Sequence, residues 1–65
     1  MDINVLASLL ATRTVTTFKA KYGADDTGLR GAVVQIGSPL NPHLVLVVDG
    51  EGILREFDRR IMRLA

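Results

Sequence analysis

Apolar residues, most of them valine, leucine and isoleucine, fill two stretches in the middle of the chain, residues 29–36 and 43–49. A polar loop with two prolines separates these stretches, and the second one leads into the dipeptide Asp49-Gly50. β-Branched runs bounded by turn residues are typical of neighbouring strands, and Asp-Gly is a strong hairpin signal. We therefore expect two adjacent strands here, with the rest of the chain packed onto their sheet.

The second of these stretches is apolar on both of the faces that a strand would present. Alternate residues of a strand point to opposite sides, which gives two apolar sets: Leu44, Leu46 and Val48 on one side, and Val45 and Val47 on the other. Such a strand is usually central in its sheet, or its second face is covered by a helix or by another subunit. We expect the N-terminal helix to supply this cover.

Residues 2–11 have the spacing of a short amphipathic helix. Ile3, Leu6 and Leu10 recur at helical intervals, and Asp2 stands where it can cap the N-terminus. A helix of about ten residues is marginal alone in water, so its apolar side must pack against another surface. We prefer a helix packed over the sheet to one that binds a partner or a second copy of the chain.

Residues 14–22 predict a half-buried antiparallel strand, because Phe18, Ala20 and Tyr22 alternate with polar residues and would share the core face. The polar segment 23–28, which has glycine at both ends, then predicts a turn. A further glycine, three residues after this segment, predicts a bend or bulge where the next strand begins.

Residues 53–65 support two different predictions. On a helical wheel the apolar residues fall on one arc, and Glu56 lies four residues before Arg60, a spacing that favours a helix. The preceding Asp-Gly signal and the alternation through Arg55 and Phe57 instead predict a return strand, a tight turn and a last short strand. The local pattern alone slightly favours the helix.

Turns and apolar positions follow a definite order in four segments: Gly28-Leu29-Arg30-Gly31-Ala32-Val33-Val34, Leu46-Val47-Val48-Asp49-Gly50, Arg55-Glu56-Phe57 and Ile61-Met62-Arg63-Leu64. This order resembles that of small SH3-like barrels of the Tudor and KOW kind, over residues 14–65. In those domains a Gly-x-Val-Val strand precedes a strand that ends in Asp-Gly, followed by an Arg-x-Phe strand, a one-turn helix and a closing strand. The resemblance implies barrel-like closure and strands, not a helix, in residues 53–65.

These patterns together predict a single domain, residues 1–65, of the mainly β α+β class. We expect an N-terminal helix followed by a small bent antiparallel sheet or an SH3-like barrel. The alternative is a three-stranded antiparallel sheet with an N-terminal and a C-terminal helix.

Length and composition add an expectation about association. The chain has 65 residues and no cysteine, so neither disulfides nor thiolate metal sites can support its small core. A second copy or a partner would supply the missing burial, and we expect a homodimer. The N-terminus lacks a secretory signal pattern, and no segment has the roughly 20 apolar residues of a membrane span. We therefore expect a soluble cytoplasmic protein that does not bind membranes.

Nothing in the sequence predicts catalysis. Ser38 is followed directly by a proline and lacks the glycine frame of a nucleophile elbow, so we interpret it as a turn residue. Asp25 and Asp26 are adjacent in a predicted turn, where acids usually point apart into solvent. His43 is the only histidine, and we interpret it as a surface loop residue. We expect no cofactor, no bound metal and no enzymatic activity.

Basic residues are the remaining candidates for binding a partner: Arg55, Arg59, Arg60, Arg63, Lys19, Lys21 and Arg30. If residues 53–65 form strands, Arg59 and Arg60 would project from the tip of their turn and join the two lysines and Arg30. The simplest interpretation of these side chains is a solvated surface with local ion pairs.

The charge balance ranks the possible partners. The net charge is only +1 and acids are mixed among the arginines, which opposes a continuous phosphate track. We therefore expect a small non-catalytic protein-binding module with a regulatory or accessory role. The alternative is a nucleic-acid-binding module of the Tudor and KOW kind that uses the C-terminal arginines.

Overall fold

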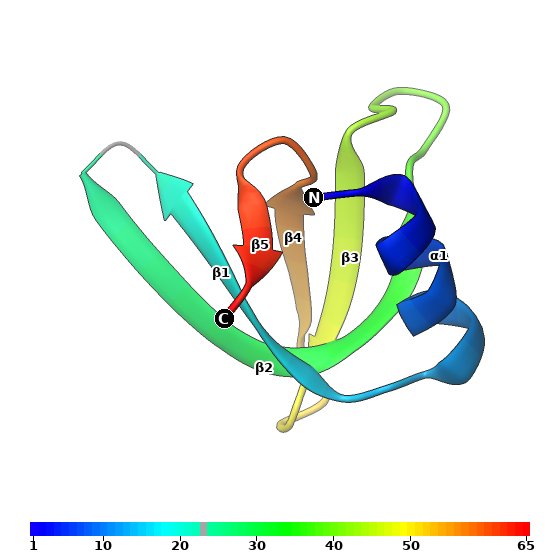
Figure 1. Ribbon diagram of the computed structural model, residues 1–65, viewed down its shortest axis with the longest axis horizontal. Helices are drawn as coiled ribbons and strands as arrows, with labels where there is room; N and C mark the ends of the chain where they lie inside the picture. The colour runs from blue at the N-terminus through cyan, green and yellow to red at the C-terminus, as the bar shows by residue number, and fades with distance from the viewer. Residues whose placement is uncertain (23) are drawn as a thin grey trace.

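One helix and five strands make up the described part of the chain, which comprises residues 1–22 and 24–65 without the side chains of Tyr22 and Asp25 (Figure 1). In this computed structural model the elements follow in the order α1 (Ile3–Thr12), β1 (Thr16–Tyr22), β2 (Asp25–Ile36), β3 (Leu44–Asp49), β4 (Leu54–Asp58) and β5 (Met62–Leu64). The prediction for the Tyr22 side chain lies outside the described residues.

The five strands form one antiparallel sheet in the order β4-β3-β2-β1-β5. The sheet is strongly bent, because β2 curves through it (Figure 1). This confirms the predicted N-terminal helix and bent antiparallel sheet. The predicted barrel closure is not found, since β4 and β5 are the two edges of the sheet and each pairs with one neighbour.

The alternative fold with a C-terminal helix was wrong, because residues 53–65 hold β4, a tight turn and β5. The side chain of Asp49 explains why the chain returns as a strand. Its Oδ1 accepts hydrogen bonds from the backbone N–H groups of Glu51 (2.9 Å) and Ile53 (3.0 Å), which fixes the β3–β4 turn. Phe57 and Met62, on the two strands, are then buried in the core.

The sequence correctly predicted the helix and its cap. The Oδ1 atom of Asp2 accepts hydrogen bonds from the N–H groups of Asn4 (2.7 Å) and Val5 (3.3 Å), which have no partner inside the helix. The helix ends at Arg13, whose backbone is left-handed (φ 52°). No helix among the described residues is long and apolar enough to cross a membrane.

Strand β2 is longer than the sequence suggested. The turn predicted over residues 23–28 was wrong for residues 25–28, which pair with β1; Asp26 lies opposite Lys21 and Gly28 opposite Lys19. The bulge comes later than expected, where the register shifts between Val33 and Gln35.

The bend of β2 depends on Gly31. A Cβ atom at this position would lie 2.2 Å from the carbonyl oxygen of Val48 and 2.8 Å from a methyl group of Val47. No side chain fits there without moving the backbone of β3, so glycine is required where β2 passes closely over its neighbour.

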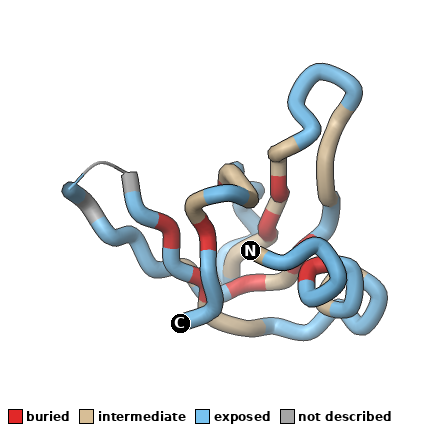
Figure 2. Tube along the Cα trace, turned by 45° about the horizontal axis from the view of Figure 1, so that its top comes forward, coloured by how far each residue is buried: buried red, intermediate tan, exposed pale blue. Residues whose placement is uncertain are grey.

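The core lies on the inside of the bent sheet, where buried positions of the helix and of all five strands meet (Figure 2). Its members are Leu6, Phe18, Ala20, Val33, Val45, Val47, Phe57 and Met62. Leu6 of α1 thus belongs to the same cluster as the inward side chains of β3. The prediction that the helix covers the second face of β3 was therefore wrong, and Leu46 and Val48 on that face remain partly exposed.

Candidate functional site

The seven basic residues singled out in the sequence lie in three separate places. Lys19, Lys21, Arg30 and Arg63 lie on the outer surface of β1, β2 and β5; Arg59 and Arg60 lie in the β4–β5 turn; and Arg55 lies on β4. Arg63, not the pair at the tip of the turn, joins the two lysines and Arg30, because β5 pairs with β1.

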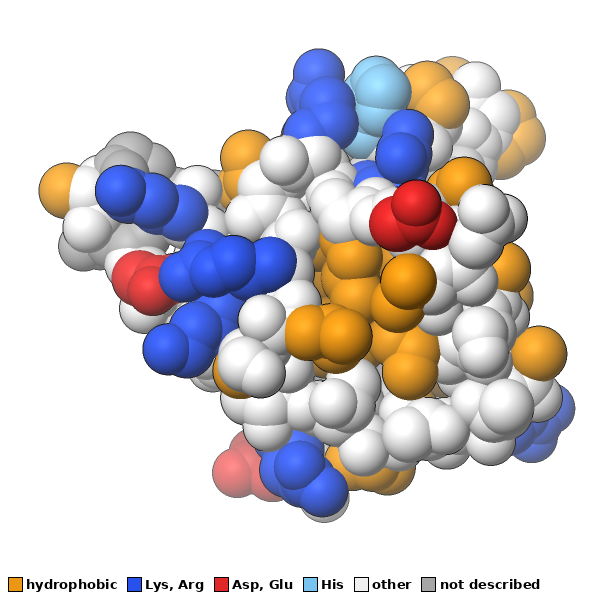
Figure 3. Space-filling view, viewed as in Figure 1, with side chains coloured by type: hydrophobic (Ala, Val, Ile, Leu, Met, Phe, Trp, Pro, Cys, Tyr) orange, Lys and Arg blue, Asp and Glu red, His pale blue; other side chains and the backbone are white. Residues whose placement is uncertain are grey.

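The first group forms a continuous surface, here called the basic face and defined as Lys19, Lys21, Arg30 and Arg63. Phe18 and Ala20 of β1 are buried, so the two lysines between and beyond them point outward. In the strand register, Lys19 lies opposite Arg63 of β5 and Thr17 lies opposite Arg30 of β2. This places all four cations on one side of the sheet. Figure 3 shows Lys and Arg side chains gathered on the side of the molecule where the β1–β2 hairpin lies.

One described acid lies on the basic face. A carboxylate oxygen of Asp26 accepts from Nη2 of Arg63 at 2.8 Å, and both side chains are about half exposed, so this pair is worth little stability. Nη1 of Arg30 donates a long hydrogen bond to the hydroxyl of Thr17, at 3.4 Å. Lys19 and Lys21 make no hydrogen bond or ion pair with any described side chain.

The two arginines of the β4–β5 turn have different roles. Arg60 forms a fork with Asp58, with Nε at 3.0 Å from Oδ1 and Nη2 at 2.6 Å from Oδ2. The side-chain hydrogen bonds from Arg60 hold the pKa of Asp58 below its ordinary value, and Asp58 raises the pKa of Arg60 in return. Arg59 contributes its backbone, since its N–H donates to the carbonyl of His43 at 2.7 Å. His43 is half-buried, and its Nδ1 has no partner among the described residues.

Arg55 belongs to the β3–β4 turn. Its Nε donates to Oδ2 of Asp49 at 3.0 Å, while the other carboxylate oxygen holds the turn. The hydrogen bond from the N–H of Ile53 and those from the Arg55 side chain and the N–H of Glu51 hold the pKa of Asp49 below its ordinary value. Arg55 is therefore engaged in stabilising a turn.

A second surface, which contains none of the basic residues predicted from the sequence, lies on the outward side of β2, β3 and β4. Ala32, Val48 and Leu54 are direct cross-strand neighbours, and Leu46 follows in the next outward row. Val34, at the bulge, is 45% exposed and Leu54 is 58% exposed. We call these five residues the apolar face. The sequence signal for it was the apolar composition of both faces of β3.

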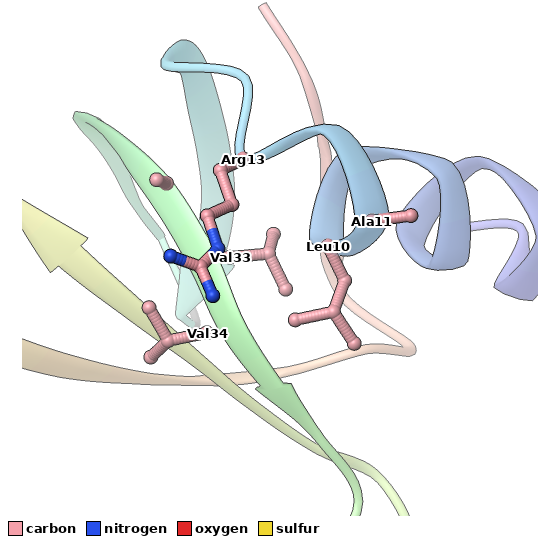
Figure 4. A pocket seen from close by; sticks show the side chains of 6 residues that line it. Leu10, Ala11, Arg13, Val33 and Val34 are labelled. Carbon is pink, nitrogen blue, oxygen red and sulfur yellow. The ribbon is translucent and has the colours of Figure 1, made fainter.

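A hollow borders the apolar face where α1 ends beside β2 (Figure 4). It is lined by Leu10, Ala11, Arg13, Ala32, Val33 and Val34. Val33 points toward Leu10 while Val34 points to the other side of the strand, and the Arg13 side chain extends across β2 between them. The apolar face thus has a cation at its margin.

Ser38 lies outside both surfaces. Ser38 is a turn residue as predicted, since its Oγ accepts from the N–H of Asn41 at 3.0 Å. Asp25 lies outside the described side chains. Among the side chains that the structure describes, no three His, Cys, Asp or Glu residues lie close enough together to hold a metal ion. No protein-family model, curated protein or solved structure matches the chain.

Proposed function

We propose that the protein is a small non-catalytic protein-binding module with a regulatory or accessory role, and that it binds through the apolar face. The observation that carries this proposal is the orientation of β3. Val45 and Val47 are fully buried by the core that includes α1, whereas Leu46 and Val48 on the other side are only partly buried. Exposed apolar surface that joins neighbouring strands marks an interaction site more often than isolated apolar residues do.

The occupant that fits this surface best is a second copy of the chain. Two copies related by a two-fold axis would pack the row of Ala32, Val48 and Leu54 against the same row of the partner, as isologous interfaces do. A core of eight buried residues among those described also leaves this small domain short of burial. The resemblance to SH3-like barrels of the Tudor and KOW kind remains part of this proposal as a relationship in strand order, since the sheet itself is open.

The size of the surface sets the expected affinity. Three strands spaced about 4.8 Å apart, with five residues each at about 3.3 Å, cover roughly 250 Å². A standard interface buries about 800 Å² on each partner. The apolar face alone is therefore too small for an obligate dimer, and we expect a dissociation constant in the micromolar range.

Sedimentation equilibrium between about 10 and 300 μM tests the proposal, together with the variant Leu54→Lys. Leu54 is already more than half exposed, so the substitution leaves the fold intact and disrupts only what packs on this surface. The matched control is Leu40→Lys in the β2–β3 loop, where the leucine is 98% exposed and lies off the apolar face. We expect the wild type and the control to dimerise equally and Leu54→Lys to be monomeric; a wild type that is monomeric throughout this range contradicts the proposal.

The nucleic-acid alternative, in the form that used the C-terminal arginines, has less support. Arg55, Arg60 and Arg63 each form an ion pair within the chain, and they lie in three different places.

A further inference from the structure

We propose that the basic face binds the sugar-phosphate backbone of a nucleic acid, without sequence preference. This inference is independent of the apolar face and uses the opposite half of β2. It rests on the register of β1 with β2 and β5, which brings together four cations from three strands.

The spacing of these cations suits a chain of repeating phosphates. Lys19 and Lys21 are consecutive outward positions of β1 and lie roughly 6.6 Å apart along the strand. This distance is about twice the 3.4 Å axial interval between the charges of one nucleic-acid strand. Arg63 and Arg30 extend the surface to either side of β1, so a phosphate chain can meet several cations at once.

The surface is also open to a ligand. Gly28 lies opposite Lys19 and carries no side chain, and a Cβ atom built there has its nearest neighbour 3.9 Å away, at the carbonyl oxygen of Phe18. Glycine in a strand often marks a place where another backbone approaches closely. Lys19 therefore projects beside a flat stretch of β2, accessible from that side.

The composition of this surface favours phosphate over a folded protein or a membrane. Where β1 pairs with β2 and β5, the described outward positions hold no apolar side chain; they are Thr17, Lys19, Lys21, Asp26, Gly28, Arg30 and Arg63. The core of a protein interface is apolar and poor in charge, and helices that lie on membranes insert apolar side chains. Arginine also matches the geometry of phosphate through its planar fork, and Arg63 keeps free N–H donors beyond the one that contacts Asp26.

Counterion release gives the expected salt dependence of binding to this surface. If Lys19, Lys21 and Arg30 each neutralise one phosphate, the slope of log K against log salt on duplex DNA is about −2.7. Raising the salt tenfold, from 20 to 200 mM, then weakens binding about 500-fold. Removing both lysines leaves one contact, and the same change in salt then weakens binding only about 8-fold.

The experiment is fluorescence anisotropy of a labelled 20-base-pair DNA of mixed sequence and of the corresponding single strand, titrated at several salt concentrations. The variant Lys19→Ala, Lys21→Ala tests the basic face. The matched control is Arg13→Ala, Arg59→Ala, which removes the same charge from two positions off the face. Circular dichroism checks that all variants fold; Lys19, Lys21 and Arg13 are exposed, and Arg59 is partly exposed.

A third variant is expected to increase the affinity for DNA. Asp26→Asn removes the one described acid from the face and releases Arg63, so it should tighten binding at 20 mM salt and steepen the slope by about 0.9. This gain cannot arise from damage to the fold.

The proposal predicts salt-sensitive binding. The lysine variant should reduce the salt slope, the control should change the affinity by no more than about threefold, and Asp26→Asn should strengthen binding. Absence of binding at 100 μM protein and 20 mM salt overturns it. Equal loss in the lysine variant and the control also overturns it, because the attraction would then follow net charge alone. Equal or tighter binding to polyglutamate or to vesicles of anionic lipid overturns the choice of a nucleic acid. The Leu54→Lys variant, which tests the apolar face, should bind DNA as the wild type does.

Discussion

Replacing Gly31 with alanine tests the most restrictive feature of this fold. The added methyl group would lie 2.2 Å from the carbonyl oxygen of Val48, well inside van der Waals contact. That oxygen belongs to the backbone of β3, which pairs with strands on both sides and cannot rotate away. The strain must therefore be relieved by moving β2 or β3.

The expected cost is large for a protein of this size. Forcing a methyl group into a packed site usually costs about 1–3 kcal/mol, and the rigid neighbour puts this position at about 3 kcal/mol or above. A domain of 65 residues has a total stability of roughly 3–10 kcal/mol, at about 0.05–0.15 kcal/mol per residue. We therefore expect Gly31→Ala to remove a third or more of the free energy of unfolding. If the total stability lies near the lower end of this range, the variant should be unfolded.

Urea denaturation followed by far-UV circular dichroism measures this effect. Gly28→Ala is the matched control, because it lies in the same strand and its new methyl group would have no neighbour closer than 3.9 Å. The control should stay within about 0.5 kcal/mol of the wild type. Truncating Val47 should not rescue Gly31→Ala, since the closer contact is with backbone. A cost below about 1 kcal/mol for Gly31→Ala would refute the close approach of the two strands.

Two further predictions concern Asp49, which holds the β3–β4 turn, and Asp2, which caps α1. The pKa of Asp49 is lowered in the folded state, so its carboxylate stabilises the fold above its ordinary pKa of 3.8, and this contribution is lost as the pH falls below it. The variant Asp49→Asn should therefore show a weaker loss of stability between about pH 4 and pH 2 in urea titrations. Asp2→Ala should cost about 1 kcal/mol by removing the helix cap, whereas Asp2→Ser should cost much less in the same assay.

Local signals in the sequence were sufficient where one short-range interaction decides the structure. The helix followed from the apolar spacing around Leu6 and from Asp2, and the β1 strand followed from its alternation. Residues 53–65 were ambiguous because their apolar residues satisfy the periods of both a helix and a strand. The turn held by the Asp49 side chain decides between them, and tertiary burial of Phe57 and Met62 reinforces it.

The candidate surfaces depend on pairing between distant segments, which residue patterns do not specify. The sequence suggested that arginines would join Lys19 and Lys21, but the arginines that it indicated were Arg59 and Arg60, at the tip of the β4–β5 turn. The register of β1 with β5 selects Arg63 instead. In the same way, the apolar composition of β3 was evident, but which of its faces the helix covers depends on how β2 bends at Gly31.

The pairing of β5 with β1 has a consequence for the order in which the molecule assembles. These strands come from opposite ends of the chain, so their contact closes the longest loop in the sheet and should form late in folding. With three residues at a sheet edge, β5 should also open by local fluctuation while the other strands stay paired. The amide of Arg63 should then exchange with solvent sooner than those of β3. A ligand held by both Lys19 and Arg63 would slow that exchange.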